Sequence, residues 1–299
     1  QQFANAAERQ ISPGAGAIKK VFYVHGLLSI QVDITLLCYC HRFRGGISMD
    51  EEIIALRELI QASQRVVVFT GAGISTESGI PDFRGPQGIW KTQTPIDFSD
   101  FIASEKWRRE SWRRKFTGDS KMANASPNAG HYAISHWISE GKISHIITQN
   151  VDGLHLQSGV PEQQIIELHG NANYASCLDC GKRYELAAIR AAFLIDESLP
   201  SCDDCAGIVK TATISFGQAM PVEAMQRAEQ ATLDCDTFIA IGSSLTVYPA
   251  AGFPALAKQN QAKLIIINNQ ETDLDPIADL VLHRPIGITL SAAAGIKTD

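Results

Sequence analysis

The 299-residue sequence lacks several features that would assign a protein to a class at once. It contains no internal repeat and no low-complexity tract, so nothing indicates a repeat architecture. It has no apolar run long enough to cross a membrane, because His25, Gln31 and Asp33 interrupt the stretch 21–40. The chain is 45% hydrophobic and 19% charged, which excludes a disordered protein. We therefore expect one large or two small globular domains and no membrane partner.

Cysteines are few, and their number is odd. Two of the seven form a Cys-x-x-Cys pair at Cys177 and Cys180, and two form another at Cys202 and Cys205, after a gap of 21 residues. This pattern does not fit a disulfide framework; it fits a reducing compartment and a metal. Two such pairs can close a tetrahedral thiolate cage around zinc, although rubredoxin-type iron uses similar pairs. Four cysteine ligands leave no open position, so we expect one structural zinc ion.

Basic residues are scarce relative to acidic ones. The chain holds 26 Lys and Arg against 32 Asp and Glu, for a formal net charge of −6. Residues 1–48 carry five basic and two acidic residues, which leaves an excess of nine negative charges for the remainder. Phosphate contacts need Lys and Arg, and three aspartates (Asp179, Asp203 and Asp204) lie within the cysteine pairs. We therefore expect no direct nucleic-acid partner, whereas basic peptides are compatible substrates.

The first 48 residues differ from the rest. They mix Gln, Gly, Pro, Cys and Arg without steady periodicity, and the first Met, Met49, directly precedes a helical pattern. We expect residues 1–48 to lie outside the folded core, as a leader or translated upstream sequence. A cytoplasmic location is expected. The alternative is a mitochondrial presequence, against which Glu8, Asp33 and the few arginines count.

Short apolar runs alternate with helical patterns over the rest of the chain. Strands are predicted at 66–69, 143–148, 164–168, 213–216, 237–241, 264–267 and 280–282, and helices at 51–62, 127–139, 222–232 and 248–258. This alternation predicts an α/β fold with a mostly parallel, Rossmann-like sheet covered by helices on both faces. Ligands of such sheets bind outside the carboxyl ends of the strands.

A glycine-rich motif follows the first predicted strand. Residues 71–85 read Gly-Ala-Gly-Ile-Ser-Thr-Glu-Ser-Gly-Ile-Pro-Asp-Phe-Arg-Gly. Glycines at 71 and 73 allow a sharp turn close to a pyrophosphate, and the helical turn after them offers N–H groups and a positive dipole end. Ordinary dehydrogenases do not continue with the Ile-Pro-Asp-Phe-Arg of residues 80–84, which adds an acid, an aromatic ring and a guanidinium. The motif therefore predicts a dinucleotide site of an unusual kind.

Three more motifs follow in order. They are Thr-Gln-Asn-Val-Asp-Gly-Leu-His at 148–155, Glu-Leu-His-Gly at 167–170 and Gly-Ser-Ser-Leu at 242–245, with the cysteine pairs between the second and the third. Together with residues 71–85, these blocks resemble the signature of the sirtuins, the NAD-dependent protein deacylases. The resemblance covers roughly residues 50–290. A lone Gly-x-Gly would be a weak signal, whereas five ordered blocks in one chain are a strong one.

The resemblance implies a domain organisation. The catalytic domain would span residues 49–290, with residues 291–299 as a tail. Its Rossmann-like large domain would consist of residues 49–83, 127–171 and 213–290. A smaller zinc-binding domain would be built from two insertions, a helical one at 84–126 and the cysteine-bearing one at 172–212.

The resemblance also implies the reaction. The acyl oxygen of an acyl-lysine attacks the anomeric carbon of the nicotinamide ribose of NAD, nicotinamide leaves, and a base activates the ribose hydroxyls so that the acyl group passes to ADP-ribose. His169 is the candidate base, because only histidine titrates near neutral pH, and it lies at the end of a predicted strand. Asn150 and Asp152 are the other catalytic candidates, although their motif read alone would be a turn.

NAD-binding residues follow from the same motifs. By resemblance, Asp82 accepts a hydrogen bond from the nicotinamide amide, Phe83 covers the site, and the charge of Arg84 suits a diphosphate. The complete set implied for NAD is Gly71, Ala72, Gly73, Ser75, Asp82, Phe83, Arg84, Gln149, Asn150, Asp152, Gly242, Ser243, Ser244 and Asn268.

The segment 213–218, Thr-Ile-Ser-Phe-Gly-Gln, resembles the family segment that pairs with the substrate backbone as an added strand. It implies substrate contacts at Ile214, Phe216 and Gly217. Gln218 stands where the family usually has Glu, and Thr211 where it usually has Pro. These departures bear on substrate preference and not on the catalytic residues.

We therefore expect an NAD-dependent enzyme that removes acyl groups, above all acetyl, from protein lysines. Residues 101–120 contain no Tyr of the kind that desuccinylating relatives use, while residues 95–101 and 112–114 look somewhat like a branch with weak deacetylase and broader deacylase or ADP-ribosyl activity. One alternative is a protein mono-ADP-ribosyltransferase. Another, from a different class, is a non-catalytic NAD-binding sensor.

Overall fold

The computed structural model describes residues 49–85 and 88–296. The prediction for residues 1–48 lies outside the described residues, as does the end of the predicted tail. Helix α10 (Ile286–Ala294) continues past residue 290, where the catalytic domain was expected to end. Ser291 and Ala293 are buried, so this end of the helix packs within the fold.

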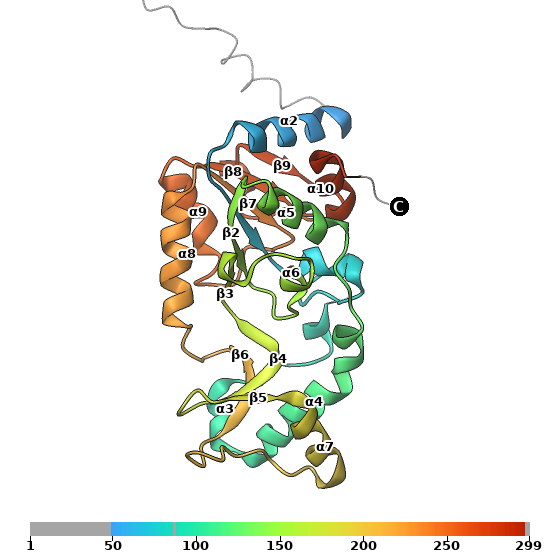
Figure 1. Cartoon of the computed structure of the whole chain (residues 1–299), viewed down its shortest axis with the longest axis vertical. Helices are drawn as coiled ribbons and strands as arrows, with labels where there is room; N and C mark the ends of the chain where they lie inside the picture. Colours follow the sequence, from blue (N-terminus) through green and yellow to red (C-terminus); the bar gives the residue numbers. More distant parts are fainter. Residues whose placement is uncertain (1–48, 86–87, 297–299) are drawn as a thin grey trace, which may run out of the picture. The chain divides into compact units, whose positions relative to one another are not determined.

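The main sheet confirms the predicted α/β class. Its strands run in the order β3-β2-β1-β7-β8-β9, and every neighbouring pair is parallel (Figure 1). The strands are β1 (Val66–Thr70), β2 (Ile143–Thr148), β3 (Ile165–Glu167), β7 (Thr237–Ile241), β8 (Lys263–Ile267) and β9 (Leu280–Leu282). The covering helices are α2 (Met49–Ala62), α5 (Ala129–Ser139), α8 (Val222–Asp234), α9 (Gly252–Gln259) and α10.

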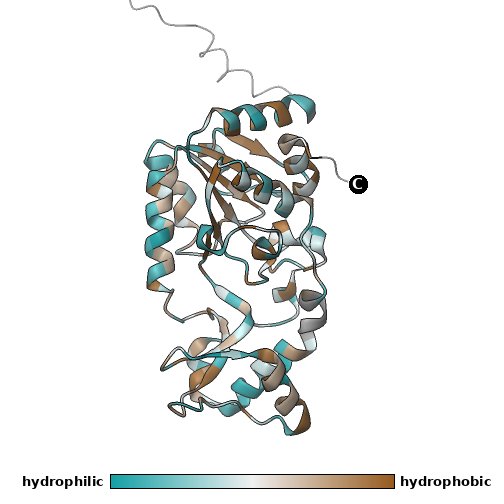
Figure 2. Cartoon of the chain, in the orientation of Figure 1, coloured by the Kyte–Doolittle hydropathy of each residue, from teal (hydrophilic) through white to brown (hydrophobic). Residues whose placement is uncertain are grey.

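Both faces of this sheet are buried, which explains its continuous apolar strands. Along β1, Val66 and Val68 join a core with residues of α2, α5 and α10, whereas Val67 and Phe69 join a second core with residues of α8 and α9. Successive side chains of a strand point to opposite faces, so one short run serves two layers. Figure 2 shows the apolar strands between helices whose outer surfaces are more polar.

The region predicted as the small domain contains a smaller antiparallel sheet, in the order β5-β4-β6. Its strands are β4 (Gly170–Cys177), β5 (Arg183–Glu185) and β6 (Val209–Thr213), and its helices are α3 (Phe98–Ala103), α4 (Glu105–Ala123) and α7 (Leu186–Asp196). Trp112 and Phe116 of α4 stack with ring centroids 5.4 Å apart, and Phe116 contacts Phe193 of α7. The helical insertion and the cysteine-bearing insertion therefore share one core.

The prediction of a strand at 213–216 is wrong. The strand β6 ends at Thr213, and it pairs antiparallel with β4 in the small sheet instead of joining the parallel one. Residues after Thr213 turn away, because Gly217 adopts a φ of +77° and the Gln218 N–H donates to the Ser215 carbonyl at 3.0 Å. An apolar run alone could not reveal this turn.

The remaining elements are short. They are η1 (Ala72–Ser78), η2 (Ile89–Lys91), α6 (Leu154–Gln157), η3 (Glu162–Gln164) and η4 (Asp275–Ile277). Within the described part of the chain, the helices all fall short of the length and apolarity that a membrane span requires.

The turns after β1 and β7 touch backbone to backbone. The Gly73 N–H donates to the Gly242 carbonyl at 2.8 Å, and the Gly71 N–H donates to the Ile241 carbonyl at 3.0 Å. A Cβ on Gly242 would lie 2.4 Å from the Ile74 nitrogen. Strand order reverses between β1 and β7, and such a switch point is where open α/β sheets bind ligands.

This contact yields a stability prediction. We expect Gly242→Ala to lower the free energy of unfolding by more than about 3 kcal/mol, because its φ of +62° and the 2.4 Å approach to the backbone both oppose a side chain. The matched control is Gly141→Ala, which has a φ of +71° but open space around its Cβ position, with an expected loss of about 1 kcal/mol. Urea unfolding of both variants measures the difference, and equal losses would contradict the steric argument.

Candidate active site

A cavity of about 460 Å³ opens beyond the carboxyl ends of the parallel strands. Its volume lies in the range of small-molecule and cofactor sites. Most residues of the predicted NAD set line it: Gly71, Ala72, Gly73, Asp82, Phe83, Arg84, Gln149, Asn150, Gly242, Ser243, Ser244 and Asn268. His169 and the predicted substrate residues Ile214, Phe216 and Gly217 line it as well. Ser75 and Asp152 do not, because they are buried beneath it.

His169 follows β3 and lies in the cavity wall. Its Nδ1 lies 3.1 Å from the carbonyl oxygen of Gln149, which can only accept a hydrogen bond. In the neutral ring, Nδ1 therefore carries the proton and Nε2 is a free base. Burial lowers the pKa of His169 below its usual value of 6.5; the Gln149 contact opposes this shift, and the charge of Arg84 adds to it. The ring is therefore neutral at physiological pH.

Asn150 is fixed by its amide nitrogen. Its Nδ2 donates to the Gly71 carbonyl at 3.1 Å and to the Ser75 hydroxyl at 3.2 Å. The Ser75 hydroxyl in turn donates to an Asp152 carboxylate oxygen at 2.7 Å. These contacts occupy the donor end of the Asn150 side chain and leave its carbonyl oxygen as the group available to a ligand.

Asp152 supports this arrangement from below. One carboxylate oxygen accepts from Ser75, and the other accepts from the Leu154 N–H at 2.9 Å, at the start of α6. Burial raises the pKa of Asp152, although both hydrogen bonds oppose that shift. Residues 150–155 thus form a turn, and the same turn places Asn150 in the wall of the cavity.

A side-chain hydrogen bond joins the turns after β2 and β7. The Gln149 side-chain amide donates to the Ser243 hydroxyl at 2.8 Å, and this hydroxyl also accepts from the Leu245 N–H. After β8, Asn268 reaches the same cavity. The ends of five parallel strands, β1, β2, β3, β7 and β8, therefore contribute to one site, as the parallel sheet predicts.

Aromatic residues close one side of the cavity. Trp90 packs against Phe83 and Phe216, with ring centroids 5.1 and 5.2 Å away, and the Arg84 guanidinium lies 4.1 Å from the centre of its ring. The Asp82 carboxylate accepts from the Gly85 N–H at 2.9 Å, which tightens the turn that carries Phe83 and Arg84. The sequence interpretation did not find Trp90; its only signal was a tryptophan in a polar insertion.

The predicted substrate segment crosses the cavity next to His169. The Ile214 N–H donates to the His169 carbonyl, and the Phe216 carbonyl accepts from the Phe98 N–H, each at 2.8 Å. Gln218 accepts from the Ser215 N–H through its side-chain oxygen at 3.1 Å. A glutamate oxygen at this position could accept the same bond, which accounts for tolerance of Gln where the resemblance leads us to expect Glu.

The four paired cysteines converge. The sulfur atoms of Cys177, Cys180, Cys202 and Cys205 all lie within 4.8 Å of one another, and the shortest pairs are 3.5 Å apart. Tetrahedral thiolate ligands of zinc are separated by about 3.8 Å, so the four cysteines are positioned to bind one zinc ion.

The two cysteine turns have matching backbones. The Gly181 N–H donates to the Cys177 carbonyl, and the Ala206 N–H donates to the Cys202 carbonyl. The residues closing both turns have positive φ, +76° at Gly181 and +57° at Ala206. The repeated turn presents the two pairs to each other.

Known proteins share this architecture. A protein-family model described as "Sir2 family" matches residues 71–249. The chain belongs to the Sir2 family. An NAD-dependent protein deacetylase of Rhodopseudomonas palustris is 50% identical over 248 residues, which cover 83% of this chain and 98% of the relative. NAD-dependent protein deacetylase 1 of Bradyrhizobium diazoefficiens is 51% identical over 240 residues, 80% of this chain and 94% of the relative.

A solved Sir2 structure with a deacetylated p53 peptide and 3'-O-acetyl-ADP-ribose superimposes with a TM-score of 0.75. It is 33% identical, and the match covers 82% of this chain and all of that one. The fold predicted for this Sir2 member and its assignment to the sirtuins are therefore confirmed.

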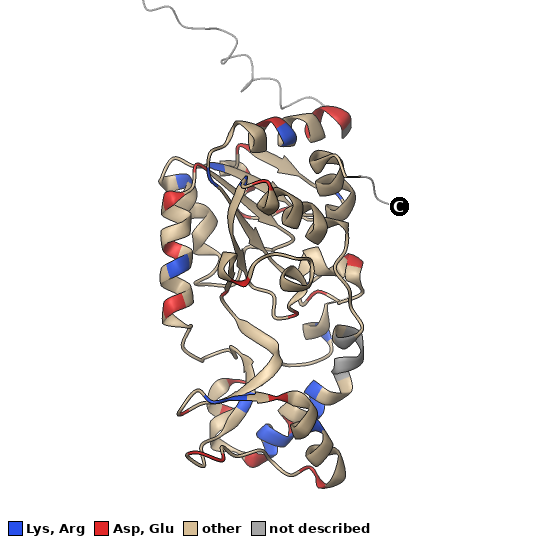
Figure 3. Ribbon diagram, in the orientation of Figure 1, with Lys and Arg blue, Asp and Glu red and all other residues tan. Residues whose placement is uncertain are grey.

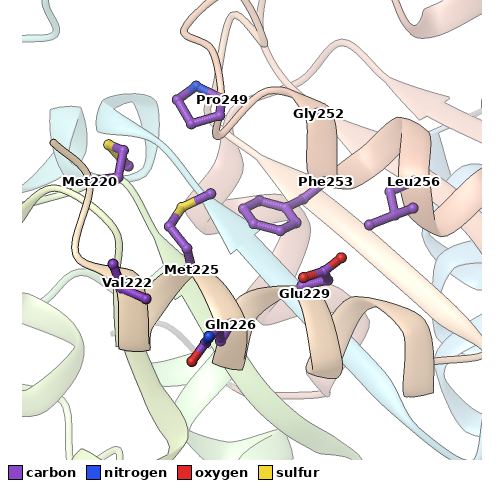
Figure 4. Close-up of a pocket in the computed structure, with 9 residues that line it drawn as sticks. All are labelled: Met220, Val222, Met225, Gln226, Glu229, Pro249, Gly252, Phe253 and Leu256. Carbon is purple, nitrogen blue, oxygen red and sulfur yellow. The ribbon is translucent and has the colours of Figure 1, made fainter. Parts of the chain in front are cut away.

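A second cavity of this Sir2 member, about 470 Å³, lies between α8 and α9 (Figure 4). It is lined by Met220, Val222, Met225, Gln226, Glu229, Pro249, Gly252, Phe253 and Leu256. Met220 and Pro249 also line the first cavity. None of the predicted catalytic or NAD-binding residues lines this second cavity.

The cysteine cluster yields a prediction about zinc. We expect elemental analysis to find one zinc ion per chain, and Cys202→Ser to lower both the zinc content and the melting temperature, because Cys177 and Cys202 are part of the small-domain core.

Cys235→Ala is the matched control, since Cys235 is a buried free thiol outside the cluster. It should retain one zinc ion per chain. A zinc-free protein with an unchanged unfolding transition would contradict a structural metal.

Proposed function

We propose that this chain is an NAD-dependent protein-lysine deacylase that acts chiefly on acetyl-lysine. The observation that carries the proposal is the neutral His169, whose free Nε2 shares one cavity with the Asn150 side chain. The names of the relatives agree with it: both bacterial proteins are NAD-dependent protein deacetylases. The acetyl-ADP-ribose and deacetylated peptide in the similar solved structure match the expected products.

The cavity residues fit NAD. Its size suits a small-molecule cofactor, and Arg84 provides a cation for the diphosphate while the turns at 71–73 and 242–244 supply close backbone and hydroxyl groups. NAD would supply the ADP-ribose that accepts the acyl group and the nicotinamide that departs. Asp82, whose carboxylate accepts the Gly85 N–H in a tight turn, is assigned as the acceptor for the nicotinamide amide.

Asn150 is assigned to the reacting centre. Its carbonyl oxygen is the end of the side chain left free, and a fixed carbonyl dipole stabilises positive charge that develops next to it. Asp152 and Ser75 act through Asn150, because they hold it from below and do not line the cavity. Ser75 and Asp152, predicted from the sequence as NAD contacts and Asp152 also as a catalytic residue, are therefore assigned a supporting role.

His169 is assigned as the general base. Its Nε2 takes a proton from a hydroxyl, and the Gln149 carbonyl stabilises the resulting imidazolium through Nδ1–H. The aromatic cluster around Trp90 limits access of water to this base, which favours transfer of the acyl group over hydrolysis.

The peptide is assigned to the crevice between the two domains, along residues 214–217, which line the cavity. Arginines of α4 are not directed at an acyl carboxylate. Arg113 binds Glu110 and Glu197, and Arg114 binds Glu110. Basic residues gather along α4 (Figure 3), and none of the arginines of this helix lines the cavity. This pairing favours acetyl over succinyl groups.

The proposal includes a cytoplasmic location, supported by free Cys235 and the four unpaired thiols of the cysteine cluster, which suit a reducing compartment.

Mass spectrometry of a reaction with NAD and an acetyl-lysine peptide tests the function. We expect deacetylated peptide, nicotinamide and acetyl-ADP-ribose in equal amounts, and a loss of turnover of about 100-fold or more in His169→Ala. His145→Ala is the control, since that histidine lies on β2 away from the cavity. ADP-ribose added to protein with an unchanged peptide would indicate the transferase, and no NAD consumption with any acyl chain would indicate the sensor.

The pKa of His169 predicts the acid limb of the pH profile. The base works only when neutral, and burial lowers its pKa below 6.5, so we expect the midpoint of the decline in turnover on the acid side to lie below pH 6.5. Turnover of the wild-type enzyme at saturating NAD and peptide measures this. A decline centred above pH 6.5 would contradict the assignment of this histidine as the base.

A further inference from the structure

Two histidines that the proposed mechanism does not use lie against each other in the interior. His131 of α5 is fully buried and His155 of α6 is 3% exposed, and their ring centroids are 5.1 Å apart. His131 Nε2 and His155 Nδ1 are both buried and have no hydrogen-bond partner among the described residues. Each ring nitrogen on the other side does have a partner, and these partners determine where the protons are.

His131 caps its own helix. The Asn128 N–H donates to His131 Nδ1 at 3.3 Å, within a capping box in which the Asn128 side chain accepts from the Gly130 and His131 amides. Nδ1 is therefore an acceptor without a proton. Burial lowers the pKa of His131 to about 4, so the ring is neutral and its single proton is on Nε2. The partnerless nitrogen of His131 is a donor.

Hydrogen bonds connect His155 with the backbone of Asn150. Its Nε2 lies 2.9 Å from the Thr70 hydroxyl, which donates to the Thr148 hydroxyl at 2.8 Å. The Thr148 oxygen also accepts the Asn150 N–H at 3.0 Å. Because the Thr70 proton is directed at Thr148, the Thr70 oxygen is free to accept from His155, and Nε2 of that ring is the donor.

The partnerless nitrogen of His155 is then an acceptor. Burial, reinforced by the neighbouring His131, lowers the pKa of His155 well below its usual value, so the ring is neutral and Nδ1 carries no proton. His131 Nε2–H is thus a donor and His155 Nδ1 an acceptor on two adjacent rings, and no direct hydrogen bond joins these two described atoms. One water between them would satisfy both and remove the desolvation penalty of two orphaned groups.

We propose that His131, His155, Thr70 and Thr148 form a hydrogen-bonded relay that positions Asn150 for the reaction. This inference rests on the proposed function. The donors of His131, His155 and Thr70 point from the start of α5 toward Thr148, whose oxygen also accepts the Asn150 N–H, so a shift at His131 is passed on to the Asn150 backbone. The Asn150 side chain is held separately by Gly71 and Ser75. The relay residues are positioning residues, since none of them lines the cavity.

The relay also connects to the glycine-rich turn. The Asn128 amide, which caps α5, donates to the Ile74 carbonyl at 2.7 Å and to the Ser78 hydroxyl at 2.9 Å, both in η1. One end of the network therefore holds the proposed cofactor turn, and the other holds Asn150. The network sets the distance between the two.

The first test is spectroscopic and does not depend on activity. Nitrogen-15 spectra of the wild-type imidazoles at neutral pH should show both rings neutral, with the proton on Nε2 and protected from exchange with water. His155→Gln, which keeps a donor near the Nε2 position but lacks Nδ1, should shift the His131 Nε2 resonance. A charged ring, or a proton on Nδ1 of either ring, would overturn the relay.

The second test separates positioning from folding. We expect Thr70→Val, which removes the hydroxyl at nearly constant volume, to lower turnover about tenfold with little change in the KM for NAD, and Thr70→Ser to restore most of it. Exchange of labelled nicotinamide should fall with turnover, because Asn150 is assigned to the step that releases nicotinamide. His136→Gln, on the exposed face of the same helix α5, should retain full activity.

Full turnover in Thr70→Val, or the same loss in Thr70→Ser, would overturn the proposal. If Thr70→Val does not fold, turnover and nicotinamide exchange in His155→Gln and His155→Leu replace it: Leu should lose more than Gln, and equal values would refute the relay. A wild-type protein without deacylase activity would reject the proposed function, and the imidazole spectra would still decide the hydrogen-bond arrangement.

Discussion

The close backbone contact between the turns after β1 and β7 is the constraint on which the rest of the site depends. Gly73 binds the Gly242 carbonyl, and neither position has room for a side chain. Because the two turns meet here, the strand ends around them converge on one crevice, and Gln149 can reach Ser243 across it. The glycines that a sequence interpretation assigns to the pyrophosphate therefore first serve the packing of the protein on itself.

A site built on this contact has to satisfy its own polar groups. Asn150 and Asp152 are buried, and there an unpaired amide would cost about 1–3 kcal/mol and an unpaired carboxylate more. Their partners are all fixed by neighbouring turns, with Ser75 from η1 and Leu154 at the start of α6. The same contacts that stabilise the fold thus orient the side chain of Asn150, so stability and preorganisation have a common source.

The sequence predicted the parallel sheet and the residues that line the cavity, because both leave local patterns. The strands 143–148 and 237–241 were predicted with the bounds that the structure gives, since buried parallel strands are continuous apolar runs. The path after Thr213 was missed, because the turn depends on a hydrogen bond from Gln218. The depth of Asp152 and the aromatic contacts of Trp90 were not visible either, as both arise from residues distant in the chain.

Hydroxyl groups at the ends of buried strands carry information that motif matching overlooks. Thr70 and Thr148 occupy the last positions of β1 and β2, where their backbones pair in register. Both side chains are buried, and a buried hydroxyl is tolerated only where it is hydrogen-bonded. Thr148 meets this condition by accepting the Asn150 N–H, and Thr70 meets it through His155. Buried polar atoms in an apolar sheet thus indicate a hydrogen-bonded connection between the core and Asn150.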